Sequence, residues 1–453
     1  MFFALVAALA WAPLWLGGNR PFAWGVNAIL FPGLALVYEI SLLVRGRRHP
    51  VGIRRLAIPA SLFAIVVAWI FIQMSTLTQA LQHPIWAMAA DVLERPVDGS
   101  ISVNRDLTAL ALLRLLTAAS ALWISIQLCH RADRAHLVIR AIGVIAAAYA
   151  AYGLVSYALF SSAIFWFDVP DGAGSIRSTF VNRNSFATYA GLGLVATAGS
   201  LLRLYRREAP ANSGSLSHRL SVFIEATGQR GWFLLGTGFV TLVALLGSGS
   251  RGGVTATALG LFVLFVMTLA RHKRRASERI EAVVFVTAAV AACFVFFGDV
   301  FVGRIASGGF ADVNRFSVYF ITLQSILDIP LLGFGFGTFA DVFPMYRDRS
   351  ISVLGVWDRA HDTYLEIFQG LGLVFGTLLL AALAYLIAQC AIGASKRRQN
   401  ATPAIVATAA AALAAVHALV DFSLEMQAVT LTFMTLLGAG FAQSISSRLV
   451  ASN

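Results

Sequence analysis

Charged residues are scarce in this chain. They make up only 12% of its 453 residues, whereas apolar residues make up 58%. A soluble domain typically carries about 25% charged residues, so this chain has too little polar surface to cover a water-soluble globule of its length. Its apolar residues stand in runs of about 17–25, which suits helices that span a hydrocarbon core of about 30 Å. Alternating blocks of about ten residues, typical of membrane β-strands, are not evident. The composition therefore predicts an all-α, polytopic membrane protein.

Cysteine and lysine are rare as well. Cys129, Cys293 and Cys390 lie far apart, in or beside apolar runs, and this pattern gives neither a disulfide framework nor a metal-binding spacing. No group of histidines and cysteines has the spacing of a zinc site either. The net charge of +12 comes from arginines clustered between the apolar runs. We therefore expect no bound metal, no cofactor and no nucleic-acid partner.

Apolar stretches suited to membrane spans number twelve. They cover residues 2–16, 21–44, 56–76, 107–129, 136–160, 184–203, 231–247, 251–270, 281–302, 364–394, 402–420 and 424–446. Residues 1–15 have no basic leader and no small-residue cleavage site, so we interpret them as a retained first span rather than a removed signal peptide. The sequence thus predicts about twelve transmembrane helices.

Basic residues test this number of spans. They cluster in the segments 45–55, 131–140, 203–230, 271–279 and 396–398. Two spans separate each consecutive pair of clusters, so all of these segments face one side. With Arg448, that side holds 22 of the 34 Lys and Arg residues. Because basic loops remain in the cytoplasm, we predict one transmembrane domain over residues 1–453, with both termini cytoplasmic and a basic cytoplasmic loop at 203–230.

The opposite side receives the longest segment between spans, residues 303–363, which we expect to be a long extracytoplasmic loop. Shorter outer segments are expected at 77–106, 161–183, 248–250 and near Asp421. Apolar residues recur at helical spacing within the long loop, after Arg315 and before Pro330. They are Phe316, Phe320, Leu323 and Leu327. This spacing predicts an amphipathic helix in the membrane interface.

The first candidate site lies where an outer segment enters the sixth span. It contains Arg177, Arg183 and the pair Asn184 and Ser185, which we expect to cap the helix. The free N–H groups of a helix start attract an anion, and two nearby guanidinium groups would strengthen that attraction. The alternative is an ordinary capped helix whose arginines lie among lipid headgroups, and the residue types alone favour neither.

The second candidate site is the turn 247–253, between the seventh and eighth spans. Arg251 stands at the start of a helix, where a positive charge opposes the helix dipole. Gly252 and Gly253 permit close approach of a neighbour or a ligand. An anion beside Arg251 would relieve the unfavourable charge placement, so we interpret this arginine as an anion ligand. The alternative is an ordinary turn whose arginine reaches the headgroups.

The third candidate site, residues 358–366, leads into the tenth span. His361 could accept a proton near neutral pH. Asp358 and Asp362 could orient its ring or hold a proton, and Glu366, about one turn further on, could be a second acid–base group. From spacing alone, a histidine that caps the helix or bonds to the backbone is the more common outcome.

At these sites the chain resembles the bacterial O-antigen ligase and O-antigen polymerase superfamily. The matching pieces are 177–186, 248–253, 330–339, 361–366 and His417 with Asp421, and together the resemblance covers roughly 177–440. Members of this superfamily are multi-pass proteins of the bacterial inner membrane. They take a glycan from an undecaprenyl-diphosphate carrier at the periplasmic face and pass it to lipid A core, a growing polysaccharide or a protein. They need no metal ion.

The resemblance implies a role for each matching residue. Arg177, Arg251 and Arg315 would bind the carrier diphosphate, and His361 would be the base that activates an acceptor hydroxyl. Many relatives have Asn-Pro-Asn where this chain has Asn-Arg-Asn, so Arg183 is either an extra phosphate ligand or a structural variation.

Three further residues, Asn184, Asp362 and Glu366, would support the site. Because diphosphate leaves as a stable anion, direct attack by the acceptor would invert the anomeric carbon without a covalent intermediate. The resemblance thus implies an inverting, metal-independent glycosyltransferase of lipopolysaccharide or polysaccharide synthesis.

Two other classes of protein remain open at this point. A transporter or flippase would need charge at mid-membrane, for which Glu39 and Arg114 are the clearest candidates, and such proteins often show repeated halves. The sequence shows no internal repeat. A structural assembly scaffold would give no reason for arginines grouped at helix starts.

Overall fold

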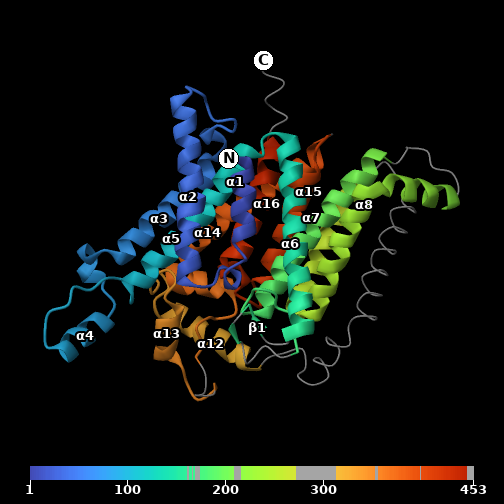
Figure 1. The fold of residues 1–453 in the computed structure, drawn as a ribbon. Coiled ribbons are helices and arrows are strands. Elements are labelled where there is room, and N and C mark those ends of the chain that lie inside the picture. The colour runs from blue at the N-terminus through green and yellow to red at the C-terminus, as the bar shows by residue number, and fades with distance from the viewer. Residues whose placement is uncertain are drawn as a thin grey trace.

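The computed structural model describes residues 1–160, 163–165, 167–168, 174–208, 216–271, 313–351, 356–397 and 399–445. Over these residues the chain forms a bundle of helices (Figure 1). The long helices are α2 (Pro21–Val44), α3 (Ala57–Met74), α5 (Arg105–Leu128), α6 (Ala132–Phe160), α7 (Arg183–Glu208), α8 (Leu216–Gly247), α9 (Arg251–Ala270), α14 (Thr363–Lys396) and α16 (Gln427–Ile445).

Shorter elements connect the long helices. They are the α-helices α1 (Phe2–Trp11), α4 (Ile85–Leu93), α12 (Val313–Asp328), α13 (Phe339–Tyr346) and α15 (Thr402–His417), and the 3-10 helices η1 (Leu16–Gly18), η2 (Ile53–Leu56), η3 (Thr76–Leu81) and η5 (Ser423–Glu425). A small antiparallel sheet pairs β1 (Ala163–Ile164) with β2 (Phe167–Asp168), and Ala163 lies opposite Asp168.

The all-α membrane fold predicted from composition is confirmed. Among the described residues, 9 helices are long and apolar enough to cross a membrane, and each coincides with a predicted span. The predicted spans 2–16 and 402–420 form the shorter apolar helices α1 and α15, of 10 and 16 residues. The predicted span 281–302 lies outside the described residues.

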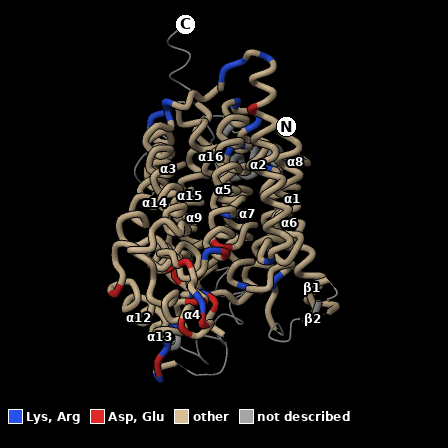
Figure 2. Tube along the Cα trace, turned by 90° about the vertical axis from the view of Figure 1, so that its left-hand side faces the viewer, with Lys and Arg blue, Asp and Glu red and all other residues tan. Residues whose placement is uncertain are grey.

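The two ends of the bundle differ in the charged residues that they carry. α1 begins and α16 ends at the same end (Figure 1), and Lys and Arg residues gather at that end (Figure 2). The opposite end carries α4, α12, α13 and the small sheet, and acidic residues gather there (Figure 2). We call these the basic end and the α12 end. The predicted loops 203–230, 271–279 and 303–363 lie partly outside the described residues, so the predicted alternation of loops stays a prediction. The positive-inside rule favours a cytoplasmic basic end, which stays a prediction as well.

Small residues let the central helices approach closely. An added Cβ atom at Gly191 of α7 would lie 2.2 Å from Thr257 Oγ1 of α9, and one at Gly440 of α16 would lie 2.2 Å from Ala407 Cβ of α15. Membrane helices have no hydrophobic driving force between them, so close backbone contact and dispersion hold them together. This tight centre fixes the α12 ends of α7, α9 and α15, which carry the candidate site.

The predicted amphipathic helix is present as α12. Its apolar stripe is between 43% and 64% exposed and consists of Phe316, Phe320, Leu323 and Leu327. The opposite side of the helix is buried through Val318 and Ile321. α12 ends at Asp328, two residues before Pro330, because proline cannot continue a helix. Its place in the membrane interface stays a prediction.

The loop after α12 is anchored to a break in α14. The break lies at Gly372, whose φ of 77° is left-handed, and it deprives nearby carbonyl groups of their helical partners. Phe334 and Gly335 donate their N–H groups to two of these carbonyls, at 2.9 and 3.1 Å. Since buried backbone groups must be paired, the break and the loop stabilise each other.

Replacing Gly333 by alanine should destabilise the protein. Gly333 has a φ of +68°, and a Cβ atom there would lie 2.4 Å from the carbonyl oxygen of Gly370. We expect a loss of about 1–3 kcal/mol, seen as a lower thermal unfolding midpoint of the detergent-solubilised protein. The matched control is Gly33→Ala in α2, where nothing lies within 4 Å of the added atom. A Gly333→Ala midpoint equal to that of Gly33→Ala would contradict this packing.

Candidate active site

The loop that carries His361 ends at the N-terminus of α14. Asp362 caps that helix, because its Oδ1 accepts from the N–H groups of Tyr364 at 2.8 Å and Leu365 at 3.0 Å. Burial raises the pKa of the Asp362 carboxyl, and the two N–H groups offset part of that rise. Thr363 donates its N–H group to the carbonyl of Ala418 at 2.9 Å. The cap therefore places the loop against the segment between α15 and α16.

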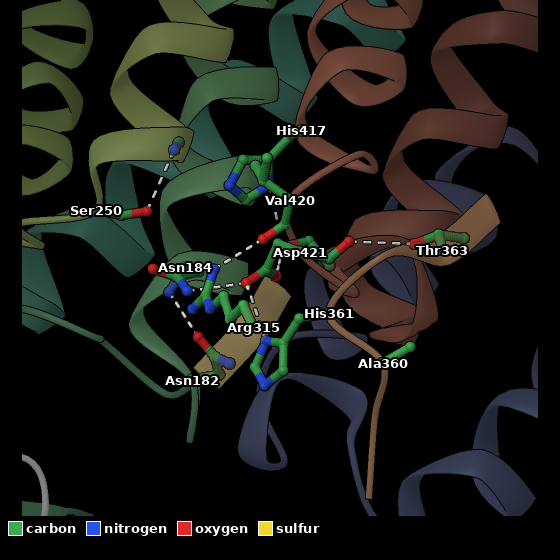
Figure 3. A network of polar contacts seen from close by, with 12 residues as sticks. Asn182, Asn184, Ser250, Arg315, Ala360, His361, Thr363, His417, Val420 and Asp421 are labelled. Carbon is green, nitrogen blue, oxygen red and sulfur yellow. Dashed lines mark hydrogen bonds and ion pairs between the residues drawn. The ribbon is translucent and has the colours of Figure 1, made fainter. Parts of the chain in front are cut away.

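His361 is held in a strained backbone conformation. Its φ is 59°, a left-handed value that is uncommon for residues other than glycine. Side chains hold both neighbouring peptide groups: Glu366 Oε1 accepts from the N–H group of Ala360 at 2.6 Å, and the Tyr319 hydroxyl donates to the His361 carbonyl at 3.0 Å. Such strain costs about 1–3 kcal/mol and is concentrated at functional sites. It turns the imidazole toward Asp421 (Figure 3).

Asp421 is the carboxylate that faces His361. His361 Nδ1 lies 4.0 Å from Asp421 Oδ2, and the Asp421 side chain is only 1% exposed. Asn184 Nδ2 donates to Oδ2 at 2.8 Å, and the Ser423 hydroxyl donates to Oδ1 at 2.5 Å. These two donors satisfy the oxygens of the buried carboxyl group.

At the third site, the sequence allowed Asp358 and Asp362 to orient the ring or hold a proton. In the structure Asp358 is exposed and Asp362 caps α14, whereas Asp421 is the carboxylate that faces the ring. Ser423 joins His417 to Asp421, because Ser423 Oγ lies 2.5 Å from Asp421 Oδ1 and 3.3 Å from His417 Nδ1.

The first candidate site joins the same network through Asn184. The predicted caps were Asn184 and Ser185, and this was wrong: α7 begins at Arg183, and Asn182 Oδ1 accepts from the N–H group of Asn184 at 2.7 Å. The Asn184 side chain is thereby free to reach Asp421. Ser185 Oγ is buried without a hydrogen-bond partner among the described residues.

The second candidate site lies against the same network. α9 begins at Arg251, as predicted, and Ser250 Oγ caps it by accepting from the N–H group of Gly253 at 3.2 Å. A Cβ atom at Gly252 would lie 3.1 Å from His417 Nε2 and 3.2 Å from Val420 Cγ2. The helix start that carries Arg251 therefore packs directly on the segment that carries Asp421.

The other predicted arginines lie at the same end of the bundle. Arg315 Nη1 donates to the carbonyl of Val420 at 2.8 Å, one residue before Asp421 (Figure 3). Arg177 Nη1 donates to the carbonyl of Val181 at 3.3 Å, and the neighbouring Ile176 donates its N–H group to the carbonyl of Gly247 at 3.0 Å. This last bond joins the Arg177 loop to the Arg251 turn.

Two arginines stand further from the network in the observed contacts. Arg183 is the half-buried first residue of α7. Arg177 lines a separate cavity of about 10 Å³. The convergence of Arg177, Arg183 and Arg251 with His361 on one ligand stays a prediction.

Behind His361 lies a buried ion network that the sequence did not reveal. Arg359 Nη1 lies 2.6 Å from Glu425 and 3.5 Å from Glu366, and Arg114 of α5 donates to the Glu425 carbonyl. Burial is the largest effect on the Glu425 carboxyl and raises its pKa, but Arg359, a hydrogen bond with Glu366 and the charge of Arg114 together outweigh burial and lower that pKa. Glu366, predicted as an acid–base group, is thus engaged with Arg359 and with the backbone before His361. The arginine beside His361 in sequence was the signal that could have indicated the network.

A comparison with known families now adds to this geometry. Residues 236–381 match the family described as O-antigen ligase. The chain carries an O-antigen ligase domain. The match includes Arg251, Arg315, His361 and Glu366, whereas Arg177, Arg183 and Asn184 precede it. A search of curated proteins gave no match.

The O-antigen ligase domain confirms the resemblance seen in the sequence. It supports a ligase role of the glycosyltransferase type in a multi-pass membrane protein. It also supports lipid-linked glycans and polysaccharides as the general class of substrate. Asp421 and Asn184 lie outside the matched residues. In the structure Asp421 nevertheless faces His361, and Asn184 donates a hydrogen bond to Asp421.

Proposed function

We propose that the protein transfers a glycan from an undecaprenyl-diphosphate carrier to an acceptor hydroxyl at the α12 end. The observation that carries this proposal is the pairing of His361 with the buried Asp421, 4.0 Å apart, where the starts of α7 and α9 meet. In this proposal the protein lies in the bacterial inner membrane, with the basic end and both termini in the cytoplasm and the α12 end in the periplasm.

The donor diphosphate binds at the two helix starts. Free N–H groups and the helix dipole favour an anion there. Arg177, Arg251 and Arg315 supply guanidinium groups that can bind phosphate oxygens bidentately, and Arg183 adds a further positive charge. Stabilisation of the charge that develops on the leaving group is the main catalytic contribution of such a site.

The acceptor hydroxyl is activated by His361. Because Nδ1 is the ring nitrogen near Asp421, the other nitrogen, Nε2, takes the hydroxyl proton. The acceptor oxygen forms a bond to the anomeric carbon as the carbon–oxygen bond to diphosphate breaks, and the diphosphate leaves with the bonding electrons. Attack opposite the leaving group inverts the anomeric centre. No step needs a metal ion, since the arginines carry the charge stabilisation.

Replacing Asp421 by asparagine tests the proposed role of this carboxylate. The variant keeps the size of the side chain but removes the charge that stabilises a protonated His361. We expect kcat to fall about 10²-fold and the pH dependence of kcat to change, with little effect on the KM of the donor. The measurement is transfer of a labelled glycan by the purified protein over a pH series. An unchanged kcat and pH profile would show that the pairing has no part in the reaction.

A transporter or flippase is the alternative function. The two charges on which it would depend are both engaged: Arg114 donates to the Glu425 carbonyl, and Glu39 accepts from Trp123 and lies 2.7 Å from His49. A proteoliposome assay without glycosyl acceptor separates the two functions. Movement of the lipid-linked glycan across the membrane would support the alternative, and transfer only when an acceptor is added supports the transferase.

A further inference from the structure

The helix α12 binds the backbone on both sides of the His361–Asp421 pair. The Tyr319 hydroxyl donates to the carbonyl of His361 at 3.0 Å, and Arg315 Nη1 donates to the carbonyl of Val420 at 2.8 Å, one residue before Asp421. Residues four positions apart lie on the same face of a helix. Because α12 is one helix of 16 residues, a single rigid element fixes the two segments relative to each other.

α12 is in turn fixed to the rest of the α12 end. Ser325 Oγ of α12 accepts from Gln369 Nε2 of α14 at 2.8 Å. The buried side of α12 also belongs to a hydrophobic cluster, which consists of Val318, Ile321, Phe339, Phe343, Ile351 and Ala360. Ala360 directly precedes His361, so the histidine loop and α12 share this cluster. The packing therefore gives the Tyr319 hydroxyl a defined position beside the loop.

The backbone of His361 depends on such a hold. Its φ of 59° is left-handed, and a side chain with a Cβ atom disfavours that conformation. On the N-terminal side, Glu366 Oε1 accepts from the N–H group of Ala360 at 2.6 Å. On the C-terminal side, the Tyr319 hydroxyl binds the peptide group that follows His361. Without this second bond, the peptide group would be free to rotate toward a less strained conformation.

The direction of the imidazole follows from this backbone conformation. The ring meets Phe422 edge to face, with the ring centroids 4.8 Å apart, and meets Trp357 in the same way at 5.6 Å. Phe422 directly follows Asp421, so the contact keeps the imidazole beside that carboxyl group. A rotation of the His361 backbone would move the ring out of both contacts. The Tyr319 bond to the carbonyl thus affects the imidazole through the backbone.

We propose that Tyr319 is a positioning residue of the transfer reaction, whose hydroxyl holds the backbone of His361 so that the imidazole lies beside Asp421. This inference rests on the proposed function, in which the imidazole accepts the proton of the acceptor hydroxyl. It also gives α12 a second role besides its predicted place in the membrane interface, because the same helix fixes the geometry of the reacting pair.

Replacing Tyr319 by phenylalanine tests this role by kinetics. The variant keeps the ring and loses only the hydroxyl, and one neutral hydrogen bond changes an equilibrium by about three- to tenfold. We expect kcat to fall by that factor, while the KM values of donor and acceptor stay at the wild-type level. The measurement is steady-state transfer of a labelled glycan by the full-length protein in nanodiscs, with the thermal unfolding midpoint recorded for each variant.

Tyr149 supplies the matched control. It is half-buried like Tyr319, and its hydroxyl also donates to a backbone carbonyl, that of Ala10, at 2.7 Å. Tyr149→Phe should therefore keep the wild-type kcat although it loses the same kind of bond. An equal fall of kcat in both variants, or a raised KM with an unchanged kcat in Tyr319→Phe, would overturn the proposal.

Chemical modification tests the hold on His361 without requiring activity. Diethyl pyrocarbonate acylates neutral imidazole, and mass spectrometry gives its rate of reaction at each histidine. The His361 side chain is 20% exposed. We expect its rate to rise about three- to tenfold in Tyr319→Phe, while the rate at His83 stays at the wild-type value. An unchanged rate at His361, or an equal rise at both histidines, would contradict the proposed hold.

The two experiments separate this inference from the proposed function. If the wild-type protein transfers glycan and Tyr319→Phe matches it in kcat and in the rate at His361, the role of Tyr319 is overturned and the transferase remains. If no transfer is found, yet the rate at His361 rises only in Tyr319→Phe, the hold on His361 is supported and the proposed function is overturned.

Discussion

Replacing His361 by asparagine should abolish glycan transfer. The imidazole is the only proposed proton acceptor for the acceptor hydroxyl, and loss of a general base typically costs about 10²–10⁴-fold in rate. Asparagine tolerates the left-handed backbone better than most residues, so the φ of 59° at this position is preserved. The measurement is transfer of a labelled glycan from its purified carrier lipid, together with the thermal unfolding midpoint.

His83 supplies the matched control for that experiment. It lies at the same end of the bundle, its Nδ1 accepts from the Ile85 N–H group at 3.2 Å, and burial lowers the pKa of its ring. An asparagine oxygen can accept the same bond, so His83→Asn should retain full activity. Full transfer by His361→Asn, or an equal loss in both variants, would remove His361 from the mechanism.

Replacing Arg251 by alanine should lower kcat/KM by about 10²–10³-fold. The guanidinium lies at the start of α9, where it would stabilise the charge that develops on the diphosphate, and one such donor is typically worth that factor. Arg251→Lys should recover only part of the rate, because lysine keeps the charge but not the bidentate geometry.

Arg95 is the control for a general effect of positive charge at the α12 end. It is exposed, beyond α4, and has no role in the proposed site. Arg95→Ala should therefore retain wild-type kcat/KM. A fall of the same size in Arg95→Ala and Arg251→Ala would show that Arg251 acts only through the overall field of that surface.

The fold was largely predictable because hydrophobic length and basic loops are local signals. Each of the long helices coincides with an apolar run, and the five basic segments separate the twelve predicted spans in pairs. The least accurate predictions were the first and eleventh spans. α1 ends at Trp11 and α15 at His417, although apolar residues continue beyond both, because a turn and not a change of polarity ends each helix.

The candidate site was predictable where its chemistry is local. Arg251 starts α9 because Ser250 caps it, and Asp362 starts α14, both within a few residues of sequence. The acid beside the histidine was not predictable in this way. Asp421 lies 60 residues after His361 in the sequence. Asn184, which donates a hydrogen bond to Asp421, lies 237 residues before Asp421.

Tertiary contacts also decided between residues with equal local propensity. Asn182 and Asn184 are both good helix caps, and only the contact with Asp421 assigns the cap to Asn182. The buried pair of Arg359 and Glu425 is another example, because its partners come from separate elements. Local pattern thus predicted where these helices begin, whereas packing determined which side chains contact one another.

The central claim is that arginines from distant parts of the chain bind one diphosphate beside His361. A double-mutant cycle tests it most directly: the affinity of the full-length protein for undecaprenyl diphosphate is measured in wild type, Arg177→Ala, Arg251→Ala and the double variant, with Arg95→Ala as control. The account predicts at least a tenfold loss in each single variant, no loss in the control, and a coupling between Arg177 and Arg251. Unchanged affinity, or losses that simply add, would contradict a shared diphosphate.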